Sequence, residues 1–317
     1  MRASAVAIDA VPSLGRPGGR TLQRSLESWR HSIAAAIPDA SSGSYDSSVI
    51  PPSVQPWARC DPGRLRGLAG VLTDIDDTLT TEGQVPMGVV AALAALRAAG
   101  IPVVAITGRP MGWSLPVAAD VPLAAVVAEN GSVALIPEGE GAVRTEYADS
   151  APVREANAKR LAAAAARIVR EVPGATLSRD SPGRVTDIAV DHAEFARLDE
   201  ATIARVVALM REEGMTATVS SIHVNGWYGS HSKLTGADWI VWRLFGRDLA
   251  AERERWLYVG DSTNDEAMFA SFPLSVGVAN LLDFAERLRQ WPAFITTHER
   301  GRGFVEVAEA LLAARGG

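Results

Sequence analysis

Short apolar segments alternate with helical patterns in two separate parts of the chain. LAGVLTD, IPVVAITG and LAAVVAEN occupy residues 68–130, and the helical pattern MGVVAALAALRAAG separates the first two. RWLYVGDS, PLSVGVAN and PAFITTH repeat this order near the C-terminus, with helical patterns at 264–270, 281–289 and 304–314. Strands that are apolar at nearly every position are covered on both faces, as in parallel sheets. The sequence therefore predicts an α/β fold with a Rossmann-like parallel sheet, helices on both faces, and strands from both ends of the chain.

The region between these two parts has a different pattern. Long helical patterns cover 152–172 and 199–213, and strand-like runs occur at RVTDIAV, ATVSS and IHVNGW. We expect a smaller inserted α+β domain at 140–229, with the core formed by 67–139 and 230–317. Residues 1–66 contain the breaker clusters LGRPGG, DASSGSYDSS and PPSVQP. They predict an irregular N-terminal extension with one amphipathic helix, in which Leu22, Leu26, Trp29 and Ile33 recur at helical spacing.

Charge and cysteine content narrow the possible partners and compartments. The formal net charge is −6 and the isoelectric point is near 5.5, which disfavours nucleic acid or an anionic membrane as a partner. The single cysteine, Cys60, cannot form an internal disulfide. Asp9, Pro12 and Pro17 interrupt what a secretory signal would require. We expect a cytoplasmic protein without membrane spans. An organelle transit peptide is the less favoured alternative for the Arg- and Ser-rich start, and the oligomeric state stays open.

Acidic residues follow two of the predicted strands. Asp74, Asp76 and Asp77 come directly after LAGVLT, and Asp261 and Asp265 come after RWLYVG. The carboxyl ends of parallel strands are where ligands bind in open α/β sheets, so these acids should converge. Clustered carboxylates repel one another, and a divalent cation would offset that repulsion. Hard oxygen ligands without histidine or cysteine favour Mg²⁺, with Asp74, Asp76, Asp261 and Asp265 as candidate ligands.

Four segments in order carry a family resemblance. They are Asp74-x-Asp76-x-Thr78, Thr107, Lys233 and Gly260-Asp261-Ser262-x-Asn264-Asp265. This set resembles the four motifs of the haloacid dehalogenase superfamily over residues 67–315. The long insertion lies between Thr107 and Lys233 and is preceded by Glu129-Asn130-Gly131. That order resembles the Cof-like, sucrose-phosphatase-like and phosphomannomutase-like branch, in which a large α/β cap follows the second motif.

The resemblance implies a role for each matched residue. Asp74 is expected to be the nucleophile that forms an aspartyl-phosphate, and Asp76 the acid that protonates the leaving oxygen and then activates water. Mg²⁺ is expected to bind the Asp74 carboxylate, the Asp76 carbonyl and Asp261, assisted by Asp265. Thr107 and Lys233 are expected to bind the phosphoryl oxygens. Further candidate substrate contacts are Thr78, Gly108, Arg109 and Asn130 in the core, and Arg184, His223 and Asn225 in the cap, where Asp187 and Trp227 add to the polar and aromatic surface.

The expected activity is Mg²⁺-dependent hydrolysis of a small soluble phosphomonoester, with a sugar phosphate as the first substrate class. A phosphomutase of the same fold and a non-catalytic binding or scaffold protein stay open as alternatives. One residue departs from the family pattern, because Asp77 stands where glycine is most frequent. We expect Asp77 to be a spectator in the chemistry.

Overall fold

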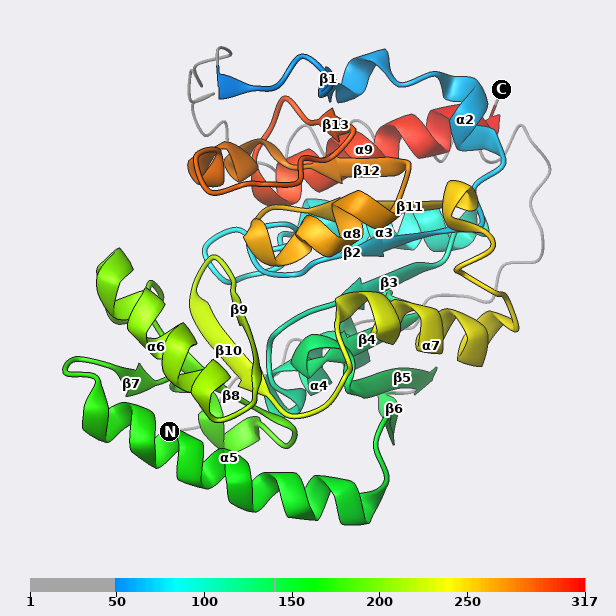
Figure 1. Cartoon of the computed structure of the whole chain (residues 1–317). Coiled ribbons are helices and arrows are strands. Elements are labelled where there is room, and N and C mark those ends of the chain that lie inside the picture. Colours follow the sequence, from blue (N-terminus) through cyan, green and yellow to red (C-terminus); the bar gives the residue numbers. More distant parts are fainter. Residues whose placement is uncertain (1–48, 140, 317) are drawn as a thin grey trace, which may run out of the picture.

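The computed structural model describes residues 49–139 and 141–316 of the 317-residue chain (Figure 1). In this part, nine strands form one large sheet in the order β1-β13-β12-β11-β2-β3-β4-β5-β6. Neighbours from β1 to β4 pair in parallel, whereas β5 and β6 pair antiparallel at one edge. The strands are β1 (Gln55–Pro56), β2 (Gly70–Thr73), β3 (Val103–Ile106), β4 (Ala125–Ala128), β5 (Val133–Gly139), β6 (Ala142–Tyr147), β11 (Trp256–Gly260), β12 (Leu274–Gly277) and β13 (Phe294–Ile295).

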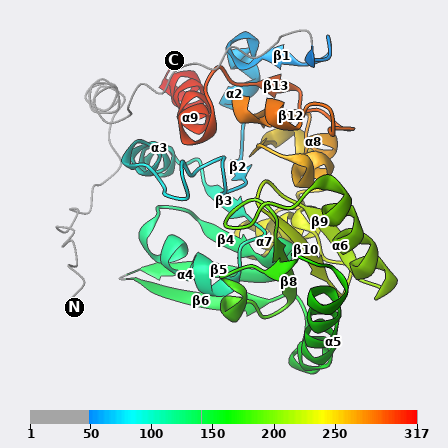
Figure 2. The ribbon, with the colours of Figure 1, turned by 90° about the vertical axis from the view of Figure 1, so that its left-hand side faces the viewer.

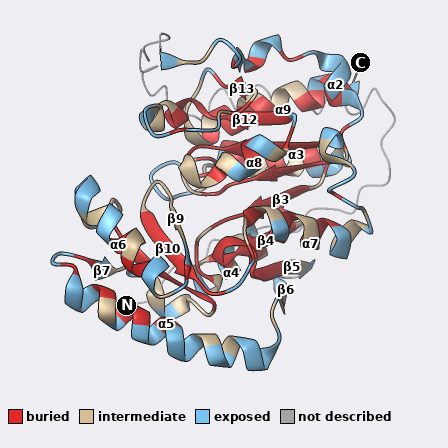
Figure 3. Ribbon diagram, in the orientation of Figure 1, coloured by how far each residue is buried: buried red, intermediate tan, exposed pale blue. Residues whose placement is uncertain are grey.

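Helices cover both faces of the large sheet. On one face, a buried apolar layer joins the strands to α2, α3, α4 and α9, with Leu93 and Phe304 fully buried within it. On the other face, α7 and α8 pack through residues such as Ile240 and Met268. These helices are α2 (Pro62–Arg66), α3 (Met87–Ala98), α4 (Met111–Asp120), α7 (Lys233–Phe245), α8 (Glu266–Ser271) and α9 (Arg300–Gly316). Figure 3 shows the central strands buried between these layers.

The inserted domain has its own sheet and its own core. Four strands of the described chain pair antiparallel in the order β7-β8-β10-β9, and α5 and α6 pack against them through Leu161, Val206 and Val224. The elements are α5 (Ala151–Glu171), β7 (Thr176–Leu177), β8 (Asp187–Asp191), α6 (Glu200–Glu212), β9 (Thr216–Val219) and β10 (His223–Trp227). This cap lies beside the carboxyl ends of the central strands (Figures 1 and 2).

Short 3-10 turns join several of these elements. They are η2 (Trp57–Arg59), η3 (Glu129–Gly131), η4 (Ser181–Gly183), η5 (Arg253–Arg255), η6 (Thr263–Asp265) and η7 (Ala279–Phe284). The predicted helix at 281–289 is absent: the 3-10 turn η7 ends at Phe284, and turns and bends follow it. Two of the turns carry residues of the candidate site: η3 directly follows β4, and η6 lies shortly after β11.

The α/β fold with an inserted α+β cap is confirmed, but two predicted boundaries differ from the structure. The sequence placed the start of the cap at residue 140, whereas β6 pairs with β5 in the large sheet. Its AVRTEY sequence lacks an apolar run because, as an edge strand, it is only partly buried. Part of the predicted irregular extension is also ordered, since β1 joins β13 and the buried Trp57 ring packs edge-on against Phe294. The predicted helix at Leu22–Ile33 lies outside the described residues.

Across residues 49–139 and 141–316, none of the helices combines the length and the apolar character needed to cross a bilayer.

Candidate active site

Three buried carboxylates meet where β2 and β11 end. The backbone N–H of Asp74 donates to the carbonyl of Val259 at 2.9 Å, which places the end of β2 beside β11. Asp74, Asp261 and Asp265 each offer an oxygen within 4.8 Å of the others, and we call these three residues the acidic cluster. All three are at most 4% exposed. The predicted convergence of the two acidic segments is therefore present in the folded chain.

Lys233 supplies positive charge to this cluster. Its ammonium lies 3.0 Å from Oδ1 of Asp74 and 2.7 Å from Oδ1 of Asp265. Lys233 is the first residue of α7, where Ser232 and Thr235 cap the helix reciprocally and fix its start. Burial acts to lower the pKa of Lys233, but the charges of Asp265 and Asp74 outweigh it and raise the pKa above its ordinary value. The lysine is therefore a charged, fixed partner of both acids.

The remaining acid contacts leave one oxygen unsatisfied. Asp265 accepts hydrogen bonds from the Tyr258 hydroxyl at 2.5 Å and the Asp261 backbone N–H at 2.9 Å. Thr78, a predicted substrate contact, instead donates from its hydroxyl to Oδ1 of Asp261 at 3.1 Å. The other oxygen of Asp261, Oδ2, is buried without a hydrogen-bond partner. A buried, unpaired carboxylate oxygen is costly unless a cation or proton meets it.

The acidic cluster fits a magnesium ion. Its donors are carboxylate oxygens alone, which Mg²⁺ prefers over the nitrogen and sulfur ligands of zinc. Burial, together with the charges of Asp265 and Asp76, raises the pKa of Asp74 to about 7 even though Lys233 acts in the opposite direction. Burial and the neighbouring acids also raise the pKa of Asp261 well above its usual range. A bound divalent cation would favour the ionised form of these carboxylates and satisfy Oδ2 of Asp261.

Asp76 and Arg109 form a pair at the boundary between core and cap. Nε of Arg109 donates to the two oxygens of Asp76 at 2.9 and 3.1 Å. Burial raises the pKa of Asp76 above its ordinary value, while the charge of Arg109 opposes that rise. Thr107 is fully buried at the end of β3, and its hydroxyl accepts from the backbone N–H of Arg109 at 3.0 Å. This hydrogen bond folds the loop after β3 so that Arg109 reaches Asp76.

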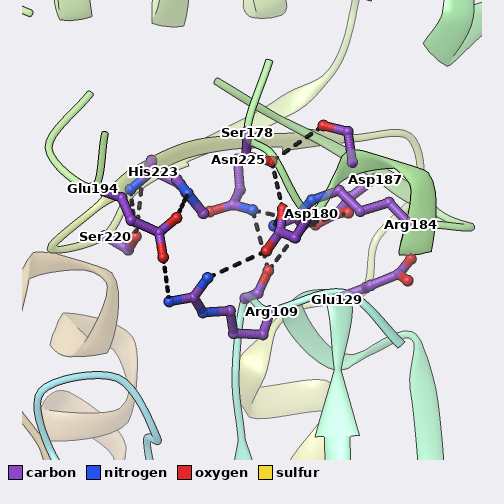
Figure 4. Close-up of polar contacts among 12 residues, drawn as sticks. Arg109, Glu129, Ser178, Asp180, Arg184, Asp187, Glu194, Ser220, His223 and Asn225 are labelled. Carbon is purple, nitrogen blue, oxygen red and sulfur yellow. Dashed lines mark hydrogen bonds and ion pairs between the residues drawn. The ribbon is translucent and has the colours of Figure 1, made fainter. Parts of the chain in front are cut away.

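Several predicted substrate contacts lie in a buried polar junction between core and cap (Figure 4). Arg184 donates to the carbonyl of Gly108 at 2.9 Å and pairs with Asp187 at 2.8 Å. The side-chain amides of Asn130 and Asn225 both donate to Oδ2 of Asp187, at 3.1 and 3.4 Å. These residues thus join the two domains. His223, Asn225, Gly108 and Arg109 also line the space between them.

A small cavity lies where the acidic cluster faces the cap. It has a volume of about 10 Å³ and is lined by Asp74, Asp76, Gly108, Arg109, Ser220, Ser221, Ile222, His223, Asn225 and Asn264. Ligand pockets commonly measure about 300–1,000 Å³, so this cavity is far too small to hold a ligand. The cap is therefore closed over the core, and a substrate larger than the cavity requires the cap to move.

Asp77 adopts a backbone conformation that suits glycine. Its φ is 52°, in the left-handed region that residues with a side chain seldom occupy. Its carboxylate pairs with Nε of Arg300 at 3.1 Å, and its carbonyl accepts from Asn280 at 3.0 Å. The carboxylate therefore has a partner in α9 and is absent from the residues that line the cavity.

Comparison with protein families agrees with this geometry. Residues 71–161 match the model of the haloacid dehalogenase-like hydrolases, a stretch that includes the Asp74 and Thr107 motifs. This part of the chain is thus similar to the haloacid dehalogenase-like hydrolases. No sequence among the curated proteins matches it.

Solved structures share the fold of this chain at low identity. The sucrose-phosphatase of Synechocystis sp. PCC6803, in complex with sucrose and phosphate, is 17% identical, has a TM-score of 0.55, and covers 76% of this chain and 96% of its own. A HAD/COF-like hydrolase from Plasmodium vivax is 17% identical with a TM-score of 0.55, covering 80% and 97%. A haloacid dehalogenase-like hydrolase from Bacteroides thetaiotaomicron is 16% identical with a TM-score of 0.55, covering 76% and 98%. At this identity the likeness establishes the capped fold.

Sequence reasoning missed the roles of three acids that lie between core and cap. Glu129 is fully buried and accepts from the backbone N–H groups of Met111, Val185 and Thr186 at 2.6–3.1 Å. Asp180 and Glu194 of the cap both pair with Arg109. Glu129 follows an apolar strand, a position that could have indicated it. Asp180 and Glu194 lie in loops without a motif, so only the folded cap reveals them.

Proposed function

We propose that this protein is a Mg²⁺-dependent phosphomonoester hydrolase that acts through an aspartyl-phosphate on a small phosphorylated metabolite. The observation that carries the proposal is the position of Lys233, 3.0 Å from Asp74, within an acidic cluster at the carboxyl edge of the sheet. A nucleophile, a fixed cation and candidate metal ligands thus meet beside the cavity that Asp74 lines. Phosphoryl transfer needs chiefly positioning and charge stabilisation, which this set provides.

The roles of the chain's own residues follow from their positions. The Asp74 carboxylate attacks phosphorus, and the bond from phosphorus to the leaving oxygen breaks. Asp76 donates its proton to that oxygen, then accepts a proton from the water that cleaves the aspartyl-phosphate. The cation of Lys233 and the hydroxyl of Thr107 hold the phosphoryl oxygens through both steps. The raised pKa of Asp76 favours the protonated form that the first step requires.

Asp74, Asp261 and Asp265, with the carbonyl of Asp76, are the proposed magnesium-binding groups. A magnesium ion bound there supplies positive charge that offsets the carboxylates and the transferred phosphoryl group. The unpaired Oδ2 of Asp261 and the all-oxygen donor set support this assignment.

The substrate class we propose is a sugar phosphate. The cap presents hydrogen-bonding groups to the cavity, including Ser221, His223 and Asn225, which suit the hydroxyls of a polyol. The similarly folded sucrose-phosphatase of Synechocystis contains sucrose and phosphate, which adds support for a carbohydrate leaving group.

Phosphate release tests the proposal. The assay uses a panel of sugar phosphates, phosphoglycolate and an aryl phosphate, each with Mg²⁺ or EDTA. We expect Mg²⁺-dependent turnover that Asp74→Asn lowers by at least about 10³-fold. Asp120→Asn, at an exposed acid of α4, is the matched control and should keep wild-type activity. Turnover that survives Asp74→Asn would rule out the proposed nucleophile.

Product analysis addresses the two remaining alternatives. Appearance of a phosphorylated isomer instead of free phosphate would identify a phosphomutase. Absence of turnover together with absence of Mg²⁺ binding would favour the non-catalytic scaffold.

A further inference from the structure

The guanidinium of Arg109 bridges the two domains through three carboxylates. In the core, Nη2 lies 2.9 Å from Oδ1 of Asp76. In the cap, the same Nη2 lies 2.9 Å from Oε1 of Glu194, and Nη1 lies 3.3 Å from Oδ2 of Asp180. Only 7% of the Arg109 side chain is exposed, so these carboxylates, rather than water, stabilise its positive charge (Figure 4). The shortest contact from the cap comes from Glu194.

Glu194 is itself held in place by two neighbours. Its second oxygen lies 3.0 Å from Nε2 of His223, a side chain that is 2% exposed. The loop that carries it is fixed by Asp191, whose carboxylate accepts from the backbone N–H groups of Glu194 and Phe195 at 2.9 Å each. Glu194 therefore reaches Arg109 from a fixed loop, and its carboxylate orientation is set by His223.

The charge of Glu194 is also secured at neutral pH. Burial acts to raise the pKa of Glu194, but the hydrogen bond from His223 and the charge of Arg109 outweigh it and lower the pKa to about 2. Asp180 shares its carboxylate between Arg109 and other partners, because it also accepts from the Ser178 hydroxyl at 2.5 Å and lies 3.4 Å from Arg184. Without Glu194, the Nη2 group would keep only Asp76 as a close acidic partner.

We propose that Glu194 is a cap-borne positioning residue that holds Arg109 against Asp76 when the cap is closed. Arg109 contacts both Glu194 of the cap and Asp76 of the core. Closure of the cap therefore completes the contacts around Asp76, the residue that transfers the leaving-group proton. The inference rests on the proposed phosphatase function. It predicts that the contribution of Glu194 depends on Arg109 and on how strongly the leaving oxygen needs a proton.

The test compares two leaving groups in a double-mutant cycle. Wild type, Glu194→Gln, Arg109→Gln and the double variant are assayed with glycerol phosphate, whose alkoxide must be protonated, and with p-nitrophenyl phosphate, whose phenolate leaves without a proton. We expect Glu194→Gln to lower kcat/KM about 10-fold for glycerol phosphate and less than about 3-fold for p-nitrophenyl phosphate. In the Arg109→Gln background the same change should have less than about 2-fold effect. Glu200→Gln, at an exposed acid of α6, is the matched control.

Three outcomes would overturn the positioning role while leaving phosphatase activity intact. They are an equal loss of kcat/KM for both esters, an unchanged kcat/KM in Glu194→Gln, and additive effects of the two substitutions. If the wild type hydrolyses neither these two esters nor any member of the phosphate panel, the proposed function fails, and the cycle is read from thermal unfolding midpoints instead. Non-additive midpoint shifts would then support the holding of Arg109 by Glu194, and additive shifts would refute it.

Discussion

The ammonium of Lys233 lies 3.0 Å from Oδ1 of Asp74, although the whole cap separates the two residues in the sequence. The contact forms because β2 ends beside the N-terminus of α7, after the chain has returned from the cap. It sets the charge balance of the acidic cluster and gives the first prediction.

Substitution of Lys233 by glutamine should impair both stability and turnover. It leaves Asp74 and Asp265 buried without their cation, which costs about 3–5 kcal/mol of unfolding free energy. We expect phosphate release to fall by about 10²-fold or more. Urea unfolding and the phosphate assay measure the two effects. The chain's other lysine, the exposed Lys159 of α5, provides the control Lys159→Gln, and similar effects at both positions would contradict the prediction.

Substitution of Asp261 by asparagine should abolish the stabilisation of the folded protein by Mg²⁺. In EDTA the variant should be at least as stable as wild type, because a buried carboxylate with an unpaired oxygen is removed. A ligand at 100 times its Kd adds about 2.7 kcal/mol, so saturating Mg²⁺ should raise the wild-type midpoint by roughly 5 °C. The midpoint of Asp261→Asn should not respond. Thermal scans with and without Mg²⁺ decide this, and an equal shift in both proteins would exclude Asp261 as a ligand.

The stability contributed by Glu194 should depend on pH. Its folded-state pKa of about 2 lies below the ordinary value of 4.5, so ionisation favours the folded state. The contribution is complete above about pH 4.5 and is lost as the pH falls toward 2. Wild type should therefore exceed Glu194→Gln by about 1–3 kcal/mol at pH 7, and the difference should shrink below pH 4.5. Thermal midpoints from pH 3 to 8 report this difference, and Glu200→Gln should show little dependence. A stability difference between wild type and Glu194→Gln that grows as the pH falls would contradict this prediction.

Substitution of Glu129 by glutamine should loosen the junction between core and cap. Its carboxylate accepts from the backbone N–H groups of Met111 in the core and of Val185 and Thr186 in the cap. An amide turns an N–H toward at least one of these donors, which costs about 2 kcal/mol. Urea unfolding should show this loss, whereas Glu155→Gln, at an exposed acid of α5, should differ from wild type by less than about 0.5 kcal/mol. Equal stabilities of the two variants would argue against the buried role.

Substitution of Gly236 by alanine should displace the start of α7. A Cβ at this position would lie 2.5 Å from Cα of Gly131, a backbone atom that cannot yield cheaply. Overpacking of this kind costs about 1–3 kcal/mol, and the shift of nearby Lys233 should lower turnover about 10-fold or more. Gly67→Ala, where a Cβ meets nothing within 4 Å, should leave both quantities near wild type. Wild-type turnover in Gly236→Ala would show that Lys233 tolerates the displacement.

The sequence by itself determined the elements whose patterns are local. Runs such as VVAI and WLYV are apolar at every position because they are buried on both faces, so β3 and β11 could be read from residue type alone. The motif order likewise indicated that Asp74, Lys233 and Asp261 belong to one site. The edge strand β6 escaped notice because main-chain pairing with β5, rather than an apolar run, holds it in the sheet.

Only the tertiary structure decided which cap residues face the core. Asp180 and Glu194 lie in cap loops whose sequences carry no motif, and the packing of the cap on the core brings both to Arg109. Arg184 and Asn130, by contrast, join at Asp187 in the junction rather than line the cavity. Burial is what gives these contacts their strength, because a charged side chain removed from water must find its partner inside the protein. Which partner it finds depends on the relative position of two domains, and that position is a property of the folded chain.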